Sequence, residues 1–152
     1  MNFKKTLTPF LVFASLLTVT ASAAAWWERV EAGNSLGCGT GGCTIVEIPV
    51  HDTSVNPKGN LSTVNVEAFR SLASTVTAKA CRRTWNASSV VCSATQSSGS
   101  GTGHASIPLS GALGSFLGAA NAGHFGFVSI TGTSVSPNQP NFAIINGLFL
   151  AD

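Results

Sequence analysis

The sequence predicts an all-β protein, a single-domain antiparallel β-sandwich or barrel of about seven short strands, with one or two short helices and two local disulfides. Short segments rich in Val, Ile, Thr and Phe alternate with clusters of Gly, Pro, Asn and Ser, a pattern typical of such folds. No repeat of fixed period and no heptad pattern is visible. The four cysteines have spacings that favour local pairing.

Seven segments are expected to be strands because each combines β-prone residues with turn residues at its ends. In chain order they are Thr44–His51, Leu61–Val66, Thr75–Trp85, Ser88–Thr95, His104–Leu109, Phe125–Thr131 and Phe142–Leu150. The segment Ser97–Gly103, composed only of Ser, Gly and Thr, is expected to be a flexible loop.

Two segments compete as short helices. Glu67–Ala73 has Phe69 and Leu72 at helical spacing and an acidic residue in its first turn. Gly111–Ala120 places three large apolar residues on one helical face, although its glycines weaken it.

The strongest local prediction is a disulfide between Cys81 and Cys92. If Asn86 and Ala87 form a two-residue hairpin turn, Arg83 faces Val90 and the two cysteines face each other. Facing residues in an antiparallel pair lie within the separation that a disulfide requires. The hairpin register therefore predicts this bridge.

The remaining cysteines, Cys38 and Cys43, then close the small loop Cys-Gly-Thr-Gly-Gly-Cys, whose glycines permit tight backbone conformations. Alternatives for the four residues are a zinc site and a redox-active pair. Zinc sites place cysteines two to four residues apart in both pairs, whereas ten residues separate Cys81 from Cys92. Neither pair has the Cys-x-x-Cys spacing of thioredoxin-like proteins, so we expect no metal and no cofactor.

The apolar C-terminal segment Phe142–Ala151 contains Asn146-Gly147, the strongest short hairpin signal in the chain. The competing interpretation is one continuous strand, buried on both faces, with a glycine bulge. Both interpretations place this segment in the core.

Residues 1–23 have the layout of a secretory signal peptide. Lys4 and Lys5 precede an apolar run, and small residues at Ala21 and Ala23 mark a cleavage site, with Ala25 as the second candidate. Cleavage would leave residues 24–152 as one disulfide-containing β domain. The alternative is an uncleaved anchor, since no charge occurs between Leu7 and Trp27. The short lysine-containing start is typical of bacteria, which predicts a periplasmic, cell-surface or secreted location.

Removal of this leader also removes two of the eight basic residues and leaves six against six acidic ones. A clustered excess of Lys and Arg, the usual mark of nucleic-acid binding, is therefore missing, so nucleic acid is not an expected partner. Charged residues make up only 9% of the chain, so Ser, Thr, Asn and Gly must cover most of the surface.

No catalytic residue is assigned. Sequence motifs of serine hydrolases and zinc proteases do not occur. The histidines are His51, His104 and His124, and His51-Asp52 is the one adjacent acid and base pair; in a strand, neighbouring side chains point to opposite faces. We interpret the histidines after Gly103 and Gly123 as structural.

A binding element has better support at the tip of the cysteine hairpin, where Arg83, Trp85 and Asn86 meet. Aromatic and Arg side chains dominate binding hot spots. Trp26 and Trp27 are candidates for a second aromatic patch. The alternative is that all three tryptophans cover the open ends of the β core.

The sequence therefore predicts an exported, non-catalytic envelope or surface protein that acts as a binding or structural module. Its expected partners are a glycan, an envelope protein or copies of itself, without stable membrane insertion after cleavage. The alternatives are a small secreted hydrolase that uses a histidine with a serine or an acid, and a secreted protease inhibitor that presents the Cys38–Cys43 loop.

Overall fold

One long strand, β5 (Thr63–Thr84), organises the fold. The computed structural model describes residues 27–50, 61–84, 89–111, 113–117, 124–136 and 138–151. The other elements are β1 (Trp27–Leu36), β2 (Cys38–Gly39), β3 (Gly42–Cys43), β4 (Val46–Val50), β6 (Val90–Cys92), β7 (Gln96–Ser97), β8 (Gly101–Leu109), α1 (Leu113–Leu117), β9 (His124–Ser134) and β10 (Ala143–Ala151). The expected leader and the Asn86-Ala87 turn lie outside these residues.

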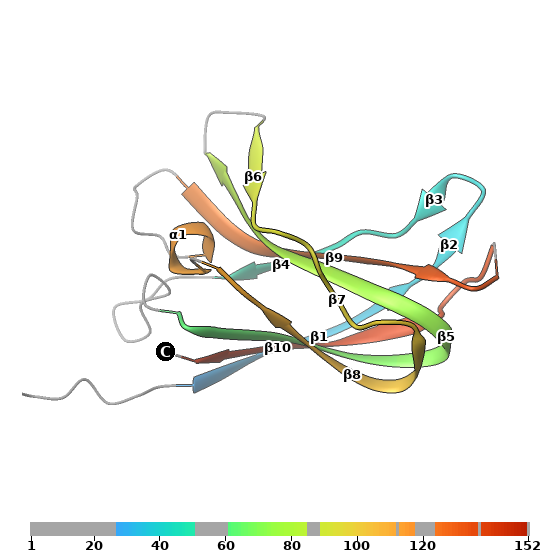
Figure 1. Cartoon of the computed structure of the whole chain (residues 1–152). Coiled ribbons are helices and arrows are strands. Elements are labelled where there is room, and N and C mark those ends of the chain that lie inside the picture. Colours follow the sequence, from blue (N-terminus) through green and yellow to red (C-terminus); the bar gives the residue numbers. More distant parts are fainter. Residues whose placement is uncertain are drawn as a thin grey trace, which may run out of the picture.

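The sheet is antiparallel and folds over on itself because β5 bends between Arg70 and Ser74 (Figure 1). Before the bend β5 pairs with β10 on one side and β8 on the other; after it, β5 pairs with β9 on one side and with β6 and β7 on the other. We call β1, β10, the β5 residues up to Arg70 and β8 the first half-sheet. The second half-sheet contains β4, β9, the β5 residues from Ser74 onward, β6 and β7. The two halves together are nearly barrel-shaped, which confirms the predicted all-β, single-domain class.

The core lies between the two half-sheets because each strand alternates small or branched apolar residues with polar ones. Along β5 the inward residues include Val64, Val66 and Ala68 before the bend and Val76, Ala78 and Ala80 after it, all at most 1% exposed. The helix α1 packs against β5 and β9 at the end opposite the bend (Figure 1). Its buried Leu117 lies over Gly126, where a side chain would overlap the helix backbone.

The predicted helix at Glu67–Ala73 is wrong, because these residues continue β5. The two strands expected at Leu61–Val66 and Thr75–Trp85 are therefore parts of a single strand. Inward burial of Val66 and Ala68 decides the backbone conformation, and the apolar residues that suggested a helix, Phe69 and Leu72, are exposed. The second helix candidate is present in shortened form as α1.

The C-terminal hairpin at Asn146-Gly147 is also wrong. β10 runs unbroken from Ala143 to Ala151 between β1 and β5, with a bulge between Ile145 and Gly147, as the competing interpretation proposed. The outer side of β10 is not fully buried, since Ile144 is 44% exposed. The bulge keeps alternate apolar side chains of β10 in the core on both sides of Gly147.

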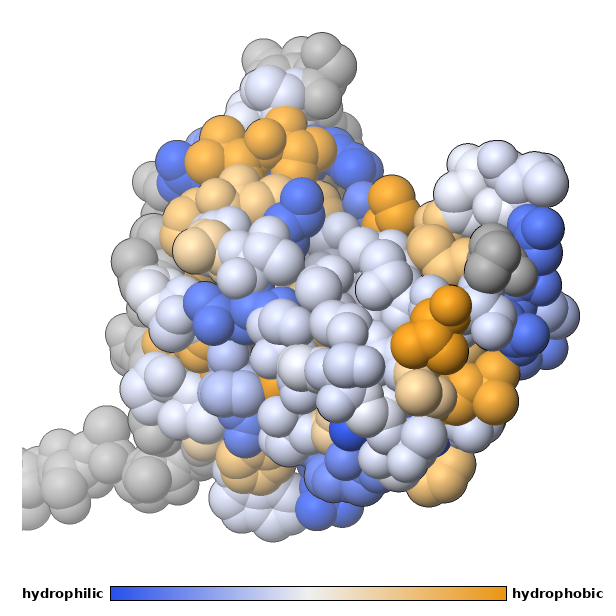
Figure 2. All heavy atoms as spheres, turned by 45° about the vertical axis from the view of Figure 1, so that its right-hand side comes forward, coloured by the Kyte–Doolittle hydropathy of each residue, from blue (hydrophilic) through white to orange (hydrophobic). Residues whose placement is uncertain are grey.

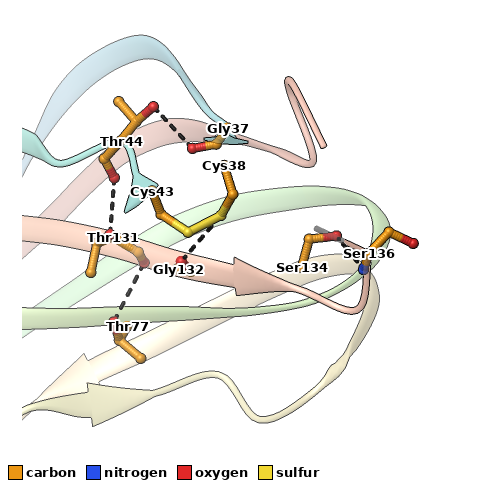
Figure 3. Close-up of a disulfide and its surroundings, with 9 residues drawn as sticks. All are labelled: Gly37, Cys38, Cys43, Thr44, Thr77, Thr131, Gly132, Ser134 and Ser136. Atoms are coloured by element: carbon orange, nitrogen blue, oxygen red, sulfur yellow. Dashed lines mark hydrogen bonds between the residues drawn. A yellow bond between two sulfur atoms is a disulfide. The ribbon is translucent and has the colours of Figure 1, made fainter. Parts of the chain in front are cut away.

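Both predicted disulfides are present. Cys81 faces Cys92 and Arg83 faces Val90, in the register expected from the hairpin, with a Cα–Cα distance of 4.0 Å between the two cysteines. Cys38 and Cys43 join β2 to β3, and the Cys38 sulfur lies 3.7 Å from the carbonyl oxygen of Gly132 on β9 (Figure 3). The Cys81–Cys92 bridge therefore joins β5 to β6, and the Cys38–Cys43 bridge closes the β2–β3 hairpin on the bend side of the molecule.

The segment 97–103, expected to be a flexible loop, instead contains the end of β7 and the start of β8. Arg70 holds it in position. This side chain is only 8% exposed and donates hydrogen bonds to the backbone oxygens of Ser74, Gly99, Thr102 and Gly103 and to the hydroxyl of Ser98.

Much of the surface visible from the bend side is pale in Figure 2, as expected for a cover of Ser, Thr and Gly. Hydrophobic residues appear there as separate patches. Among the residues that the structure describes, no helix has the length and apolar character that crossing a bilayer requires.

Candidate functional site

The outer face of the first half-sheet carries side chains from four neighbouring strands that point away from the core. Their register aligns them in rows across the sheet. Arg29, Phe149, Asn65 and Pro108 form one row, from β1 through β10 and β5 to β8. Successive residues of a strand alternate between faces, so the next row on this face follows two residues further along each regular strand.

That next row contains Glu31, Gly147, Glu67 and Ser106. Gly147 has no side chain, and the place that its Cβ would take is filled by the backbone of Val30 on β1. Neighbouring strands are about 4.8 Å apart, which places the Cα atoms of Glu31 and Glu67 at roughly 10 Å from each other. The row therefore has a carboxylate on each side of Gly147 and no side chain between them.

An open depression of about 540 Å³ lies over this part of the sheet. Its lining is mixed, with acidic, basic, amide, histidine and aromatic groups: Arg29, Val30, Glu31, Ala32, Asn65, Glu67, His104, Asn146, Gly147, Leu148 and Phe149. Both β1 and β10 are irregular here, β1 between Glu31 and Asn34 and β10 at Asn146. Bulges re-aim side chains and bend strands, and these two shape the depression.

Glu67 is the most firmly held polar group of the lining. The Ser106 hydroxyl donates to its Oε1 at 2.6 Å, and His104 Nε2 lies 2.7 Å from its Oε2. All three residues come from the paired strands β5 and β8. The carboxylate is thereby fixed in one orientation while it keeps the remaining lone pairs of both oxygens as acceptors.

This hydrogen-bond chain differs from a hydrolytic triad. In a triad the histidine lies between the serine and the acid, so that it can take the hydroxyl proton. Here the acid lies between Ser106 and His104, and the serine proton is directed to a carboxylate. The arrangement orients Glu67 and does not generate a serine nucleophile.

Aromatic rings border the depression on the β1 and β10 side. Trp27 and Phe149 stack with ring centroids 6.4 Å apart and an angle of 22° between the ring planes. Trp27 is 68% exposed. The stack presents apolar ring surface to solvent directly beside the polar groups of Arg29 and Asn65.

Of the binding residues predicted at the hairpin tip, the structure describes only Arg83. Arg83 is on the outer face of the second half-sheet, where it pairs with Glu47 at 3.5 Å and its guanidinium lies 5.2 Å from the centre of the Phe127 ring. Trp85 and Asn86 lie outside the described residues, so a meeting of these three residues stays a prediction. Arg83 does not belong to the depression.

The two histidines that the structure describes, His104 and His124, lie on different strands. His104 contacts the acid Glu67, whereas His124 begins β9 and its buried Nδ1 has no hydrogen-bond partner among the described residues. His51 and Asp52 lie outside the described part of the chain. All four cysteines form disulfides, so they cannot supply the thiolates of a zinc site. The described residues contain no group of three or more His, Cys, Asp or Glu side chains placed to hold a metal ion.

Sequence reasoning missed most residues of this site. Arg29 and Glu31 lie on β1, which was not expected, and Glu67 was assigned to a helix. The signal for β1 was the alternation of Val30 and Ala32 with charged residues, and these two side chains do pack against the core. Since the site forms only when four strands align, its composition is not visible in any one segment.

Comparisons with protein-family models, with curated proteins and with solved structures found no match to this chain.

Proposed function

We propose that this protein is an exported, non-catalytic module that binds a saccharide in the depression on the outer face of the first half-sheet. The observation that carries the proposal is the combination of polar groups around Gly147, among which Glu67 is held in one orientation by Ser106 and His104, with the aromatic stack of Trp27 and Phe149 beside them.

The chemistry of a sugar ring matches both parts of this lining. Sugar hydroxyls donate and accept hydrogen bonds, and the depression offers carboxylate acceptors at Glu31 and Glu67 and donors at Arg29, Asn65 and Asn146. The C–H face of a pyranose ring is apolar and packs on an aromatic ring such as Phe149. Small-molecule sites combine apolar surface with a few oriented polar groups in the same way.

The charges of the lining favour some saccharides over others. Two carboxylates, Glu31 and Glu67, outnumber the single guanidinium of Arg29. A uronic acid would bring a third carboxylate close to these two, and like charges repel. We therefore expect neutral sugars to be preferred over acidic ones.

Binding is favoured over the hydrolase alternative by the contacts of Glu67. The Ser106 hydroxyl donates a hydrogen bond to that carboxylate instead of to a histidine, and the His104 side chain is 64% exposed. The inhibitor alternative has weaker support because the Cys38–Cys43 loop contains only glycines and one threonine, and no large side chain to fill a protease pocket.

The first experiment measures saccharide binding by the processed protein, residues 24–152, on a glycan array and then by titration calorimetry. We expect Glu67→Gln and Phe149→Ala to weaken binding about tenfold each, which corresponds to about 1.4 kcal/mol. The matched controls are Glu47→Gln and Phe125→Ala, which make the same changes on the second half-sheet and should leave the affinity unchanged. Absence of binding to any saccharide, or equal effects in both pairs of variants, would contradict the proposal.

Export is tested by the intact mass of the protein after expression of the full chain in a bacterium with a periplasm. The proposal predicts a chain that begins at Ala24, or at Trp26 for the second cleavage site, and that lacks four thiol hydrogens because both disulfides are formed. Recovery of the full chain with four reduced cysteines would refute export.

A further inference from the structure

A second pair of exposed apolar side chains lies on the same outer face. Phe69 on β5 and Ile144 on β10 are directly opposite each other, and they are 50% and 44% exposed. Side chains of this size on neighbouring strands normally face the core, and adjoining exposed apolar residues mark binding surfaces. The core side of these strands is filled by other residues, such as Ala68 and Ala143, so the pair is not needed for packing there.

The pair adjoins the depression. Phe69 is directly opposite His104 on β8, and His104 is hydrogen-bonded to Glu67 in the lining. At the other end of the depression, Asn65 is opposite Phe149 of the aromatic stack. One outer face therefore carries apolar surface, then polar groups, then apolar surface again, in the direction of the strands.

The length of this surface is set by β5. Asn65 and Phe69 are four positions apart, which corresponds to about 13 Å along the strand at about 3.3 Å per residue. One pyranose ring placed over Gly147 contacts the polar groups and Phe149 but does not extend to Phe69 at the same time. A chain of several sugar rings covers all three parts.

We propose that the ligand is a linear oligosaccharide that lies along the strands and occupies three successive subsites. These are the Trp27–Phe149 stack, the polar depression over Gly147, and the Phe69–Ile144 pair. The inference rests on the proposed saccharide-binding function and adds the chain length and the direction of the ligand. The polar groups fix the middle ring by hydrogen bonds, and the apolar pairs contact the C–H faces of the rings on either side.

The test is a series of the bound saccharide from one to six rings, with the affinity of each measured by calorimetry for the processed protein. We expect the affinity to rise by about tenfold or more between one ring and the length that fills the three subsites, and then to stay constant. Phe69→Ala should remove the last part of this gain and leave the affinity for the single ring unchanged. Phe149→Ala should weaken binding at every length, because the stack adjoins the polar depression.

Ile144→Thr is a second variant of the same subsite that keeps a β-branched residue in β10, and Phe125→Ala is the control on the second half-sheet. Thermal unfolding of each variant shows that the fold is intact. An affinity independent of chain length, or a loss in Phe69→Ala that is equal for one ring and for long chains, overturns the inference while the saccharide site stands. Failure of every saccharide to bind overturns the proposed function, and the inference falls with it.

Discussion

Arg70 shows how one residue sets the geometry of the whole sheet. It is a buried cation, and its five hydrogen-bond acceptors, four backbone oxygens and the Ser98 hydroxyl, are all neutral. A charge removed from water must be compensated by such groups, and the planar guanidinium can serve several acceptors at once. The acceptors belong to the bend of β5, to the segment between β7 and β8 and to the start of β8, so Arg70 connects the bend of β5 to the segment that leads into β8.

We expect Arg70→Met to lower the free energy of unfolding by about 3 kcal/mol, because buried backbone oxygens lose their donors. Chemical denaturation of the purified protein measures this change. Arg83→Met is the matched control: Arg83 is half exposed, and its one ion pair is worth at most about 1 kcal/mol. Equal losses in the two variants would show that Arg70 does not hold the bend.

At the scale of elements, the bulge of β10 at Asn146-Gly147 affects both the stability of the fold and the shape of the candidate site. Gly147 has a φ of 152°, and a side chain there would overlap the backbone oxygen of Val30 on β1. Only glycine therefore lets β1 approach β10 closely at the centre of the depression.

Gly147→Ala should lower the free energy of unfolding by about 2 kcal/mol through this overlap and should also weaken saccharide binding, because β1 carries Arg29 and Glu31. The control is Gly33→Ala on the same strand pair, where an added methyl group meets no neighbouring atom. Thermal unfolding and calorimetry measure both effects. If Gly147→Ala changes the free energy of unfolding and the saccharide affinity no more than Gly33→Ala does, the close approach of β1 and β10 matters neither for stability nor for binding.

Elements that depend on local register could be predicted from the sequence, and those that depend on distant strands could not. The Cys81–Cys92 pairing followed from counting along one hairpin. The interpretation of Asn146-Gly147 as a hairpin failed because β1 and β5, far away in the chain, pair with both sides of β10 and hold it extended. Glu67 was assigned to a helix for the same reason, since its neighbours Val66 and Ala68 are recruited into a core that no local pattern reveals.

At the scale of the whole molecule, a folded-over antiparallel sheet gives this small protein two different outer faces. One carries the Arg83–Glu47 pair, and the other carries the depression with apolar pairs at both ends. The two local disulfides close only hairpins, so the arrangement of the half-sheets rests on their shared core and on the bend in β5. The fold class could be predicted from strand-like segments alone, whereas the site arises from the alignment of β1, β10, β5 and β8.

The measurement that tests the saccharide-binding claim most directly is an NMR titration of the isotope-labelled, processed protein with the oligosaccharide that binds best on the array. The account predicts that amide shifts concentrate on β1, β10, β8 and the first part of β5, with the largest around Gly147 and Glu67, while β4, β9 and the residues near Arg83 stay unchanged. Shifts centred on Arg83 and the second half-sheet, or no shifts at saturating ligand, would contradict it.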